Sequence, residues 1–300
     1  MDERRIPLDD KMRADVPAFD QHRDDGTHEA RPDVAYKRIV FVNVLFIGSN
    51  DVGDRGWTLV DAGVASGSVG PIRHAAEERF GKDARPNAIV LTHGHFDHIG
   101  AAQELAEEWD CPIYAHLLEL PYLNGTSAYP EPDPSVGGGL IALSSPTFPR
   151  GPVDLGPRLR TLPEDGSVPG MPDWRWIPAP GHSVGQVALW RESDRTLIAA
   201  DAFVTTDQES LYAALTQKLE LQGPPAYFTC DWPTAKQTVQ TLANLEPEVV
   251  VTGHGRAMAG AEMRSRLHEL ASDFDRIAIP ENGKYLLHPA RVEDGTAYVS

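Results

Sequence analysis

Three histidines and an aspartate stand within six residues, in the hexapeptide HGHFDH at residues 93–98. Imidazole nitrogens and carboxylate oxygens are the ligands that zinc and its divalent neighbours bind. The chain has 11 histidines in 300 residues, and a cluster this dense is therefore not expected by chance. The apolar run 88–91 directly before it is typical of a buried strand, and the end of a strand is a common place for chemistry. We therefore predict a metal site at residues 93–98.

Four more histidines and aspartates stand at the ends of other apolar segments. His182, His254 and Asp201 each follow such a segment, and Asp61 ends the segment 57–60. Glycines flank His254 and precede His182, and glycine lets the backbone approach a shared site closely. We expect these residues to lie at the same edge of the fold as the hexapeptide.

The elements that must position these residues follow from hydrophobic periodicity. Strands are predicted at residues 39–47, 57–60, 88–92, 112–115, 174–177, 186–190, 196–200 and 249–252, and helices at 71–81, 102–109, 232–245 and 259–275. The second half of the chain repeats the first, because in each half a strand ends in Asp and a later strand runs into His. This duplication predicts an α/β fold in which two sheets pack face to face with helices outside.

Composition divides the chain further. Residues 1–34 are charged with little periodicity, and we predict a polar arm there, followed by a single domain at 35–300. Residues 124–172 are rich in Pro and Gly and are predicted to be a loop or lid insertion.

Charge and cysteine content exclude several function classes. The formal net charge of −17 disfavours nucleic acid and anionic membranes as partners. Two cysteines, Cys111 and Cys230, are too few for a disulfide framework and are expected to be buried apolar residues. No stretch approaches 18 apolar residues, and the first residues lack the apolar region of a secretory signal. We expect a soluble, cytoplasmic protein that acts on a small molecule, with homodimer formation left open.

The pattern HxHxDH, followed by a lone His, an Asp and a last His, resembles the metallo-β-lactamase superfamily over residues 38–256. The resemblance implies a four-layer αββα sandwich of two mixed β-sheets flanked by helices. It also implies a ligand map: His93, His95 and His182 for one metal ion, Asp97, His98 and His254 for a second, and Asp201 between the two. Asp61 matches an aspartate that supports the ligands in this family without binding metal.

The same resemblance implies hydrolysis by a hydroxide that bridges two divalent ions, with zinc expected and iron or manganese as alternatives. Asp97 and Asp201 are the predicted catalytic carboxylates, and Asp97 could also pass a proton to the leaving group. A structural metal site would be closed and four-coordinate, whereas this ligand set leaves positions open.

The branch of the superfamily is less defined. Val204 stands where related lactonases that act on acyl-homoserine lactones carry a catalytic Tyr, and the Arg and Asn residues that bind glutathione in glyoxalase II are missing. His95 speaks against flavodiiron proteins, which carry Glu at that place. Iron-dependent persulfide dioxygenases share the motif and remain an alternative, as does a glyoxalase II-like thioesterase.

Aromatic residues expected near the site favour a lactone or carboxylic ester as substrate, with thioesters next and a phosphotriester also left open. These residues are Tyr122, Tyr129, Phe148, Trp174 and Phe203.

Overall fold

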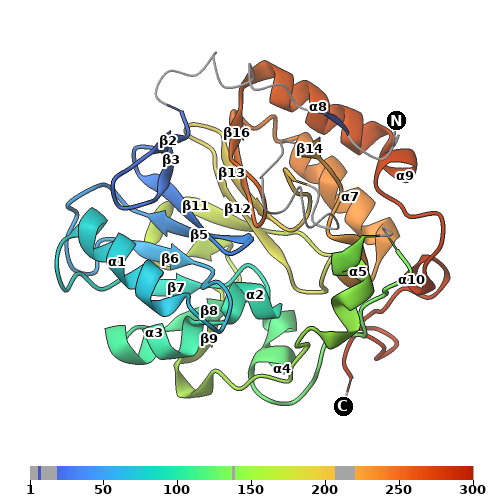
Figure 1. Cartoon of the computed structure of the whole chain (residues 1–300), viewed down its shortest axis with the longest axis horizontal. Helices are drawn as coiled ribbons and strands as arrows, with labels where there is room; N and C mark the ends of the chain where they lie inside the picture. Colours follow the sequence, from blue (N-terminus) through green and yellow to red (C-terminus); the bar gives the residue numbers. More distant parts are fainter. Residues whose placement is uncertain (1–5, 8–18, 137–138, 207–219, 300) are drawn as a thin grey trace.

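The computed structural model describes residues 6–7, 19–136, 139–206 and 220–299. The strands of these segments form two large mixed sheets and a small two-stranded sheet. In Figure 1, helices α1 (Val69–Phe80) and α3 (Ala102–Trp109) lie on one side of the strands, and α7 (Trp232–Ala243) and α8 (Gly260–Ser272) lie on the other. The described chain therefore has four layers.

The larger sheet runs in sequence order through the first half of the chain. Its strands are β2 (Gln21–His22), β3 (His28–Arg31), β4 (Val34–Ile39), β5 (Val42–Ile47), β6 (Thr58–Val60), β7 (Ala88–Val90), β8 (Ile113–Ala115) and β9 (Leu159–Thr161). Strands β2 to β6 are antiparallel, and β6 to β9 are parallel. Helices α1 and α3 lie in the crossovers from β6 to β7 and from β7 to β8, and residues 116–158 form the crossover from β8 to β9.

The second sheet contains β10 (Ser167–Val168), β11 (Met171–Pro178), β12 (Val187–Arg191), β13 (Thr196–Ala200), β15 (Val249–Thr252) and β16 (Met258–Ala259). Its one parallel pair among the described strands is β13 with β15, and α7 is the crossover between them. The small sheet pairs β1 (Ile6–Pro7) with β14 (Glu220–Leu221). Shorter helices are α2 (Phe96–Ile99), α4 (Leu120–Leu123), α5 (Leu140–Ser144), α9 (Phe274–Ile277) and α10 (Lys284–Leu287).

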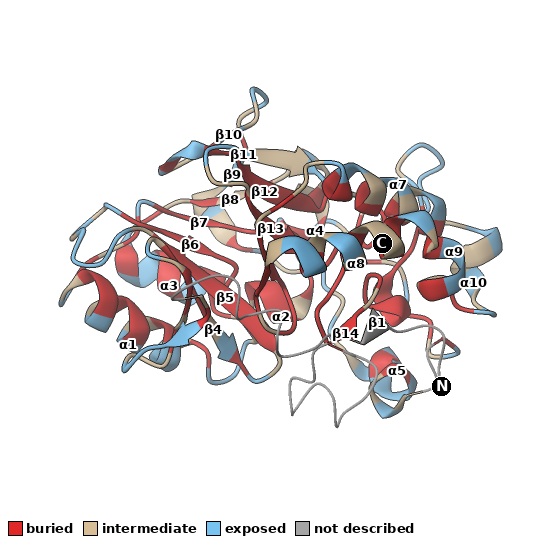
Figure 2. Ribbon diagram, turned by 90° about the horizontal axis from the view of Figure 1, so that it is seen from above, coloured by how far each residue is buried: buried red, intermediate tan, exposed pale blue. Residues whose placement is uncertain are grey.

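Alternation of side chains along the central strands explains the four layers. In β5, Leu45 points into the core between the sheets, and Phe46 points to the core under α1 and α3. In β13, Ile198 joins the same central core, and Leu197 packs toward α7 and α8. Because successive strand residues face opposite sides, a strand buried on both faces must be apolar throughout. Figure 2 shows these central strands as buried along their length.

The α/β sandwich predicted from the sequence is therefore confirmed, and helix boundaries lie close to the expected ones. Helix α1 ends at Phe80, and Gly81 follows it with a positive φ of 104°. Two helices were predicted too long, because the chain turns at Asn244 after α7 and at Asp273 between α8 and α9.

Two predicted segments differ from the structure. The arm predicted at residues 1–34 includes β2 and β3, which extend the larger sheet, and its buried residues Ala30 and Val34 join the central core. Residues 1–5 and 8–18 of the arm lie outside the described residues. The insertion predicted at 124–172 contains α5 and strands β9 and β10, and these strands complete an edge of each large sheet. Short strands of mixed composition carry too weak an alternation to show in the sequence.

Within the described residues, no helix combines the length and apolar character needed to cross a lipid bilayer.

Candidate metal centre

Strand ends from both large sheets deliver the predicted site residues to one place. In the larger sheet, β6 leads directly into Asp61, and β7 leads through Thr92 into His93. His95 occupies the N-cap position of α2, and this helix carries Asp97 and His98 in its first turn. In the second sheet, β11, β13 and β15 lead into His182, Asp201 and His254. All eight residues are buried, and none is more than 6% exposed.

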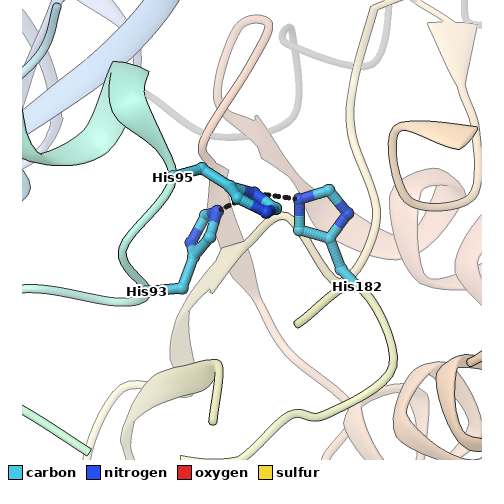
Figure 3. Close-up of side chains that lie close together, drawn as sticks. All are labelled: His93, His95 and His182. Atoms are coloured by element: carbon cyan, nitrogen blue, oxygen red, sulfur yellow. Dashed lines mark hydrogen bonds between the residues drawn. The ribbon is translucent and has the colours of Figure 1, made fainter. Parts of the chain in front are cut away.

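His93, His95 and His182 converge on one point, as Figure 3 shows. Nδ1 of His95 lies 3.0 Å from Nε2 of His93 and 3.0 Å from Nε2 of His182. A neutral imidazole carries one N–H and one lone pair, so one Nδ1 cannot donate to both neighbours. Three ring nitrogens at this spacing instead suit a shared cation, and we call this group the three-histidine set.

A second group lies beside the first and contains Asp97, His98 and His254, whose ligand atoms also lie within 4.8 Å of one another. We call it the mixed set. Oδ2 of Asp201 lies between the groups, 3.6 Å from Nε2 of His182, 3.6 Å from Nε2 of His98 and 3.1 Å from Nε2 of His254. One carboxylate is thus within reach of both sets.

Hydrogen bonds on the outer side of the rings turn the inner nitrogens toward the centre. Nδ1 of His98 contacts Asp61 at 2.8 Å, and Nδ1 of His182 contacts the Thr229 hydroxyl at 3.1 Å. Nδ1 of His254 lies 3.0 Å from the backbone carbonyl of Phe41. Such contacts fix ring orientation and leave Nε2 free for a metal ion, as is usual for metal-binding histidines.

Two observations show that the site fits a divalent cation. Nε2 of His98 and Oδ1 of Asp201 are buried polar atoms without a hydrogen-bond partner within the described chain, and such atoms are costly unless something binds them. A Cβ atom at Gly253 would lie 2.0 Å from Oδ1 of Asp201, so only glycine leaves room for this carboxylate. The imidazole and carboxylate donors are those that divalent transition metals bind.

Electrostatics differ between the two sets. Burial lowers the pKa of His182 to about 4, and burial followed by neighbouring histidines holds the pKa of His93 and of His95 well below the usual range. The three-histidine set is therefore neutral near pH 7, with lone pairs available.

In the mixed set, the carboxylates dominate. Burial alone would lower the pKa of His98, but Asp201, Asp61 and Asp97 raise it well above its usual value. The pKa of His254 is raised by Asp201 and Asp97 in the same way, against burial. These two histidines in turn hold the pKa of Asp201 well below its usual value, although burial opposes this. Near pH 7, the mixed set therefore holds a protonated His98 next to an ionised Asp201, whereas the three-histidine set is neutral.

Aromatic rings border the centre, and they differ in part from those predicted. Phe228, in the short helix η5 (Ala226–Phe228), stacks on His95 with ring centroids 4.6 Å apart. The predicted Tyr129 lies 4.4 Å from His95, and the predicted Phe148 lies 5.4 Å from Phe96 and 6.2 Å from Phe228. Phe41 stacks on His254 at 6.0 Å. These rings give the centre an apolar border.

Three of the predicted aromatic residues instead belong to the cores. Trp174 is buried between the sheets, under the Arg191 guanidinium, and Phe203 is buried in the core on the α7 and α8 side. Tyr122 is also buried and stacks on Tyr129 at 3.7 Å, one ring further from the histidines. The sequence analysis did not predict Phe41, Phe96 or Phe228 as border residues. Phe96 could have been predicted, because it lies inside the hexapeptide 93–98.

A sequence model described as the metallo-β-lactamase superfamily matches residues 38–254. The chain belongs to this superfamily. Among curated proteins, it is 48% identical over 221 residues to "Probable metallo-hydrolase YflN" of Bacillus subtilis, covering 74% of this chain and 83% of that protein. It is 29% identical over 197 residues to "Probable metallo-hydrolase YybB" of the same species, covering 66% and 74%.

Solved structures agree on the fold of this superfamily member. A β-lactamase domain protein from Burkholderia ambifaria superimposes with a TM-score of 0.60 at 22% identity, covering 90% of this chain and 79% of that chain. This likeness confirms the predicted metallo-β-lactamase fold, with its two mixed sheets between helices. Both Bacillus subtilis relatives are named probable metallo-hydrolases, and this chain shares their superfamily.

Proposed function

We propose that this protein is a metallo-hydrolase that uses two divalent metal ions to cleave an ester bond in a small molecule, with a lactone or carboxylic ester as the preferred substrate. One observation carries the proposal: Oδ2 of Asp201 lies within 3.6 Å of histidines from both the three-histidine set and the mixed set. A shared carboxylate between two groups of ligands is the arrangement that a pair of metal ions needs.

In this proposal, each set holds one ion, and Asp201 binds both. The three-histidine set would hold the first ion, and Asp97, His98 and His254 would hold the second. Zinc is the expected metal, with iron or manganese as alternatives, because the donors are imidazole and carboxylate without thiolate. When bound, such ions lower the pKa of a water to about 7 and polarise the carbonyl of an ester.

The chain's own residues prepare the site for this chemistry. Asp61 and Thr229 hold the rings of His98 and His182 in the orientation that ligation requires. Asp97 is, at 6% exposure, the least buried of the predicted ligands. In this proposal its carboxylate would take a proton from the attacking water and pass it to the departing oxygen. Phe41, Phe228 and Tyr129 lie against the ligand histidines and limit access of bulk water to them.

The apolar border supports a neutral substrate. Partly buried Phe96 and Phe148 extend it beyond Phe228, and an apolar wall with few polar groups suits small organic molecules. Val204 is buried and pairs with Gln222, so the position three residues after Asp201 offers no hydroxyl to a substrate. Lactones other than the acyl-homoserine lactones therefore fit the proposal best.

A pH-indicator assay on the zinc-loaded full chain tests this function. Aliphatic lactones, S-lactoylglutathione and a phosphotriester are compared at matched concentrations, with the His182→Ala variant as the control. Fast acid release from lactones, with little from the thioester, supports the proposal. Faster thioester cleavage would assign a glyoxalase II-like activity instead. No acid release, together with oxygen consumption on glutathione persulfide, would overturn the hydrolase and indicate a dioxygenase.

A further inference from the structure

A buried glutamate that no sequence motif indicates lies behind the three-histidine set. Glu119 ends the short helix η2 (Leu117–Glu119), and its exposed fraction is 0%. Its carboxylate accepts hydrogen bonds from four neutral donors, which are two backbone amides and two hydroxyls. A buried carboxylate is costly unless its oxygens are well satisfied, so this arrangement has a structural or functional reason.

The two oxygens of Glu119 hold two different loops. Oε2 accepts from the amide of Gly94 at 2.9 Å and from the Tyr129 hydroxyl. Oε1 accepts from the Ser183 hydroxyl at 2.8 Å and from the amide of Gly185 at 2.8 Å. Gly94 stands between His93 and His95, and Ser183 follows His182. One side chain therefore joins the two loops that carry the three-histidine set.

These loops start from different sheets, because one follows β7 and the other follows β11. The distance of 3.0 Å between Nδ1 of His95 and Nε2 of His182 spans this junction. Tyr129 strengthens the loop on the β7 side, since the Gly94 amide also lies 2.8 Å from its hydroxyl oxygen. The separation of the histidines thus depends on what Glu119 holds.

The glycines of both loops leave space for this contact. A Cβ atom at Gly94 would lie 2.6 Å from the Tyr129 hydroxyl oxygen. A Cβ atom at Gly185 would lie 2.8 Å from the backbone nitrogen of Glu119 and 2.9 Å from its Oε1. Any larger residue at either position would push the loop away from the carboxylate, so the sequence of both loops accommodates Glu119.

We propose that Glu119 is a positioning residue that sets the affinity of the three-histidine set for a divalent metal ion, by fixing the separation of the two loops without touching the ion. The inference rests on the proposed function, in which this set binds metal. The mixed set has no hydrogen bond to Glu119 within the described residues, so its affinity does not depend on this carboxylate. Partners of metal ligands commonly change metal affinity by about 10- to 100-fold.

The test measures zinc affinity by competition with a chromophoric chelator in two backgrounds of the full chain. His254→Ala disrupts the mixed set and leaves the three-histidine set, whereas His95→Ala does the reverse. Glu119→Gln keeps the shape of the side chain but replaces an accepting oxygen with a donating NH₂ group. We expect zinc affinity to fall by about 10-fold or more in the His254→Ala background and to change little in the His95→Ala background.

Tyr129→Phe and Ser183→Ala each remove one donor from Glu119 and serve if Glu119→Gln does not fold. Tyr122→Phe is the matched control, because Tyr122 stacks on Tyr129 but donates its hydroxyl hydrogen to the Ala297 carbonyl instead. We expect weaker zinc binding in the first two variants and wild-type binding in the control. Circular dichroism and thermal unfolding in excess chelator check the fold separately.

The outcomes separate this inference from the proposed function. Wild-type zinc affinity in folded Glu119→Gln, or in both folded single-donor variants, would overturn the role of Glu119 and leave the hydrolase intact. An equal loss in both backgrounds would also overturn it, because that result would indicate a general structural role. If the His254→Ala protein with native Glu119 bound no zinc at all, the proposed ligand map itself would fail.

Discussion

The carboxylate of Asp61 and the imidazole of His98 form a buried pair, with Oδ2 of Asp61 2.8 Å from Nδ1 of His98. The same carboxylate accepts two bonds from Thr92, from the amide at 2.8 Å and from the hydroxyl at 2.8 Å. Asp61 has a positive φ of 60°, a conformation uncommon for a residue with a side chain. The chain therefore bends at Asp61, directly after β6. There the carboxylate connects Thr92, which follows β7, to His98 of the mixed set.

This pair gives the first prediction. In Asp61→Asn, one accepting oxygen becomes an NH₂ group, which faces either the Thr92 amide or the His98 ring and the Thr92 hydroxyl. Either arrangement disturbs the contacts that fix the orientation of the His98 ring. We expect the affinity of the mixed set for zinc to fall by about 10- to 100-fold. Chelator competition measures this, with Asp54→Asn as the control, because Asp54 is an exposed aspartate paired with Arg85 at 2.8 Å. Unchanged zinc affinity in Asp61→Asn would remove Asp61 from the support of the site.

Removing a predicted ligand has a larger effect. Asp201→Ala deletes the carboxylate shared by both sets, so we expect this variant to lose both ions and its turnover. His182→Ala deletes one of three ring donors, so we expect it to lose the ion of the three-histidine set, and with it turnover. Metal content after gel filtration and the rate of ester hydrolysis are measured on the same samples. His74→Ala is the matched control, since His74 is exposed on α1. Full metal and full activity in either ligand variant would show that the ligand map is wrong.

The aromatic border predicts how the site treats substrates of different length. Phe148→Ala removes an apolar contact beyond the histidines while leaving the ligands in place. We expect KM for a long-chain lactone to rise by about 10-fold, with a smaller rise for a short-chain lactone and little change in kcat. Val52→Ala, an exposed apolar residue outside this border, serves as the control. Equal effects on both substrates would mean that Phe148 does not contact the substrate chain.

The two thiols give a prediction about pH. Burial raises the pKa of Cys111 to about 11 and of Cys230 to about 12. Since the thiolate is the reactive form, the native protein should react with a disulfide reagent at pH 8 far more slowly than the chain in guanidinium. Because both pKa values lie above those of an unfolded cysteine, these groups make the free energy of unfolding decrease as pH rises above about 9. Rapid reaction of either thiol in the native protein would contradict their burial.

Sequence reasoning succeeded where the relevant information is local. His93 and Asp201 each follow an apolar strand, and strand ends meet at a sheet edge, so clustering could be predicted from position alone. His95 and His182 lie 3.0 Å apart although 87 positions separate them. Their positions after apolar segments predicted a shared edge of the fold, but only the resemblance to a known family assigned them to the same metal ion.

Contacts between distant segments could not be predicted. Glu119 lies in an unremarkable run of leucines, yet it bonds to Gly185, 66 positions away. Phe228, which lies between β14 and α7, stacks on His95, which follows β7 in the other large sheet. Residues 39–47 show one continuous apolar run in the sequence, but Val40, with a φ of 60°, turns the chain between β4 and β5. Aromatic residues near strand ends suit either a core or a pocket wall, so the sequence left both places open for Trp174 and Phe203. In the structure both lie in the cores.

The dependence of lactone hydrolysis on metal content is the most direct test of whether the protein is an ester hydrolase with two metal ions. Metal-free protein is titrated with zinc, and the initial rate of acid release from an aliphatic lactone is measured at each ratio of zinc to chain. We expect the rate to keep rising until two zinc ions are bound per chain and then to stay constant. A rate that saturates at one ion, or lactone hydrolysis that never exceeds the metal-free rate, would contradict a dinuclear ester hydrolase.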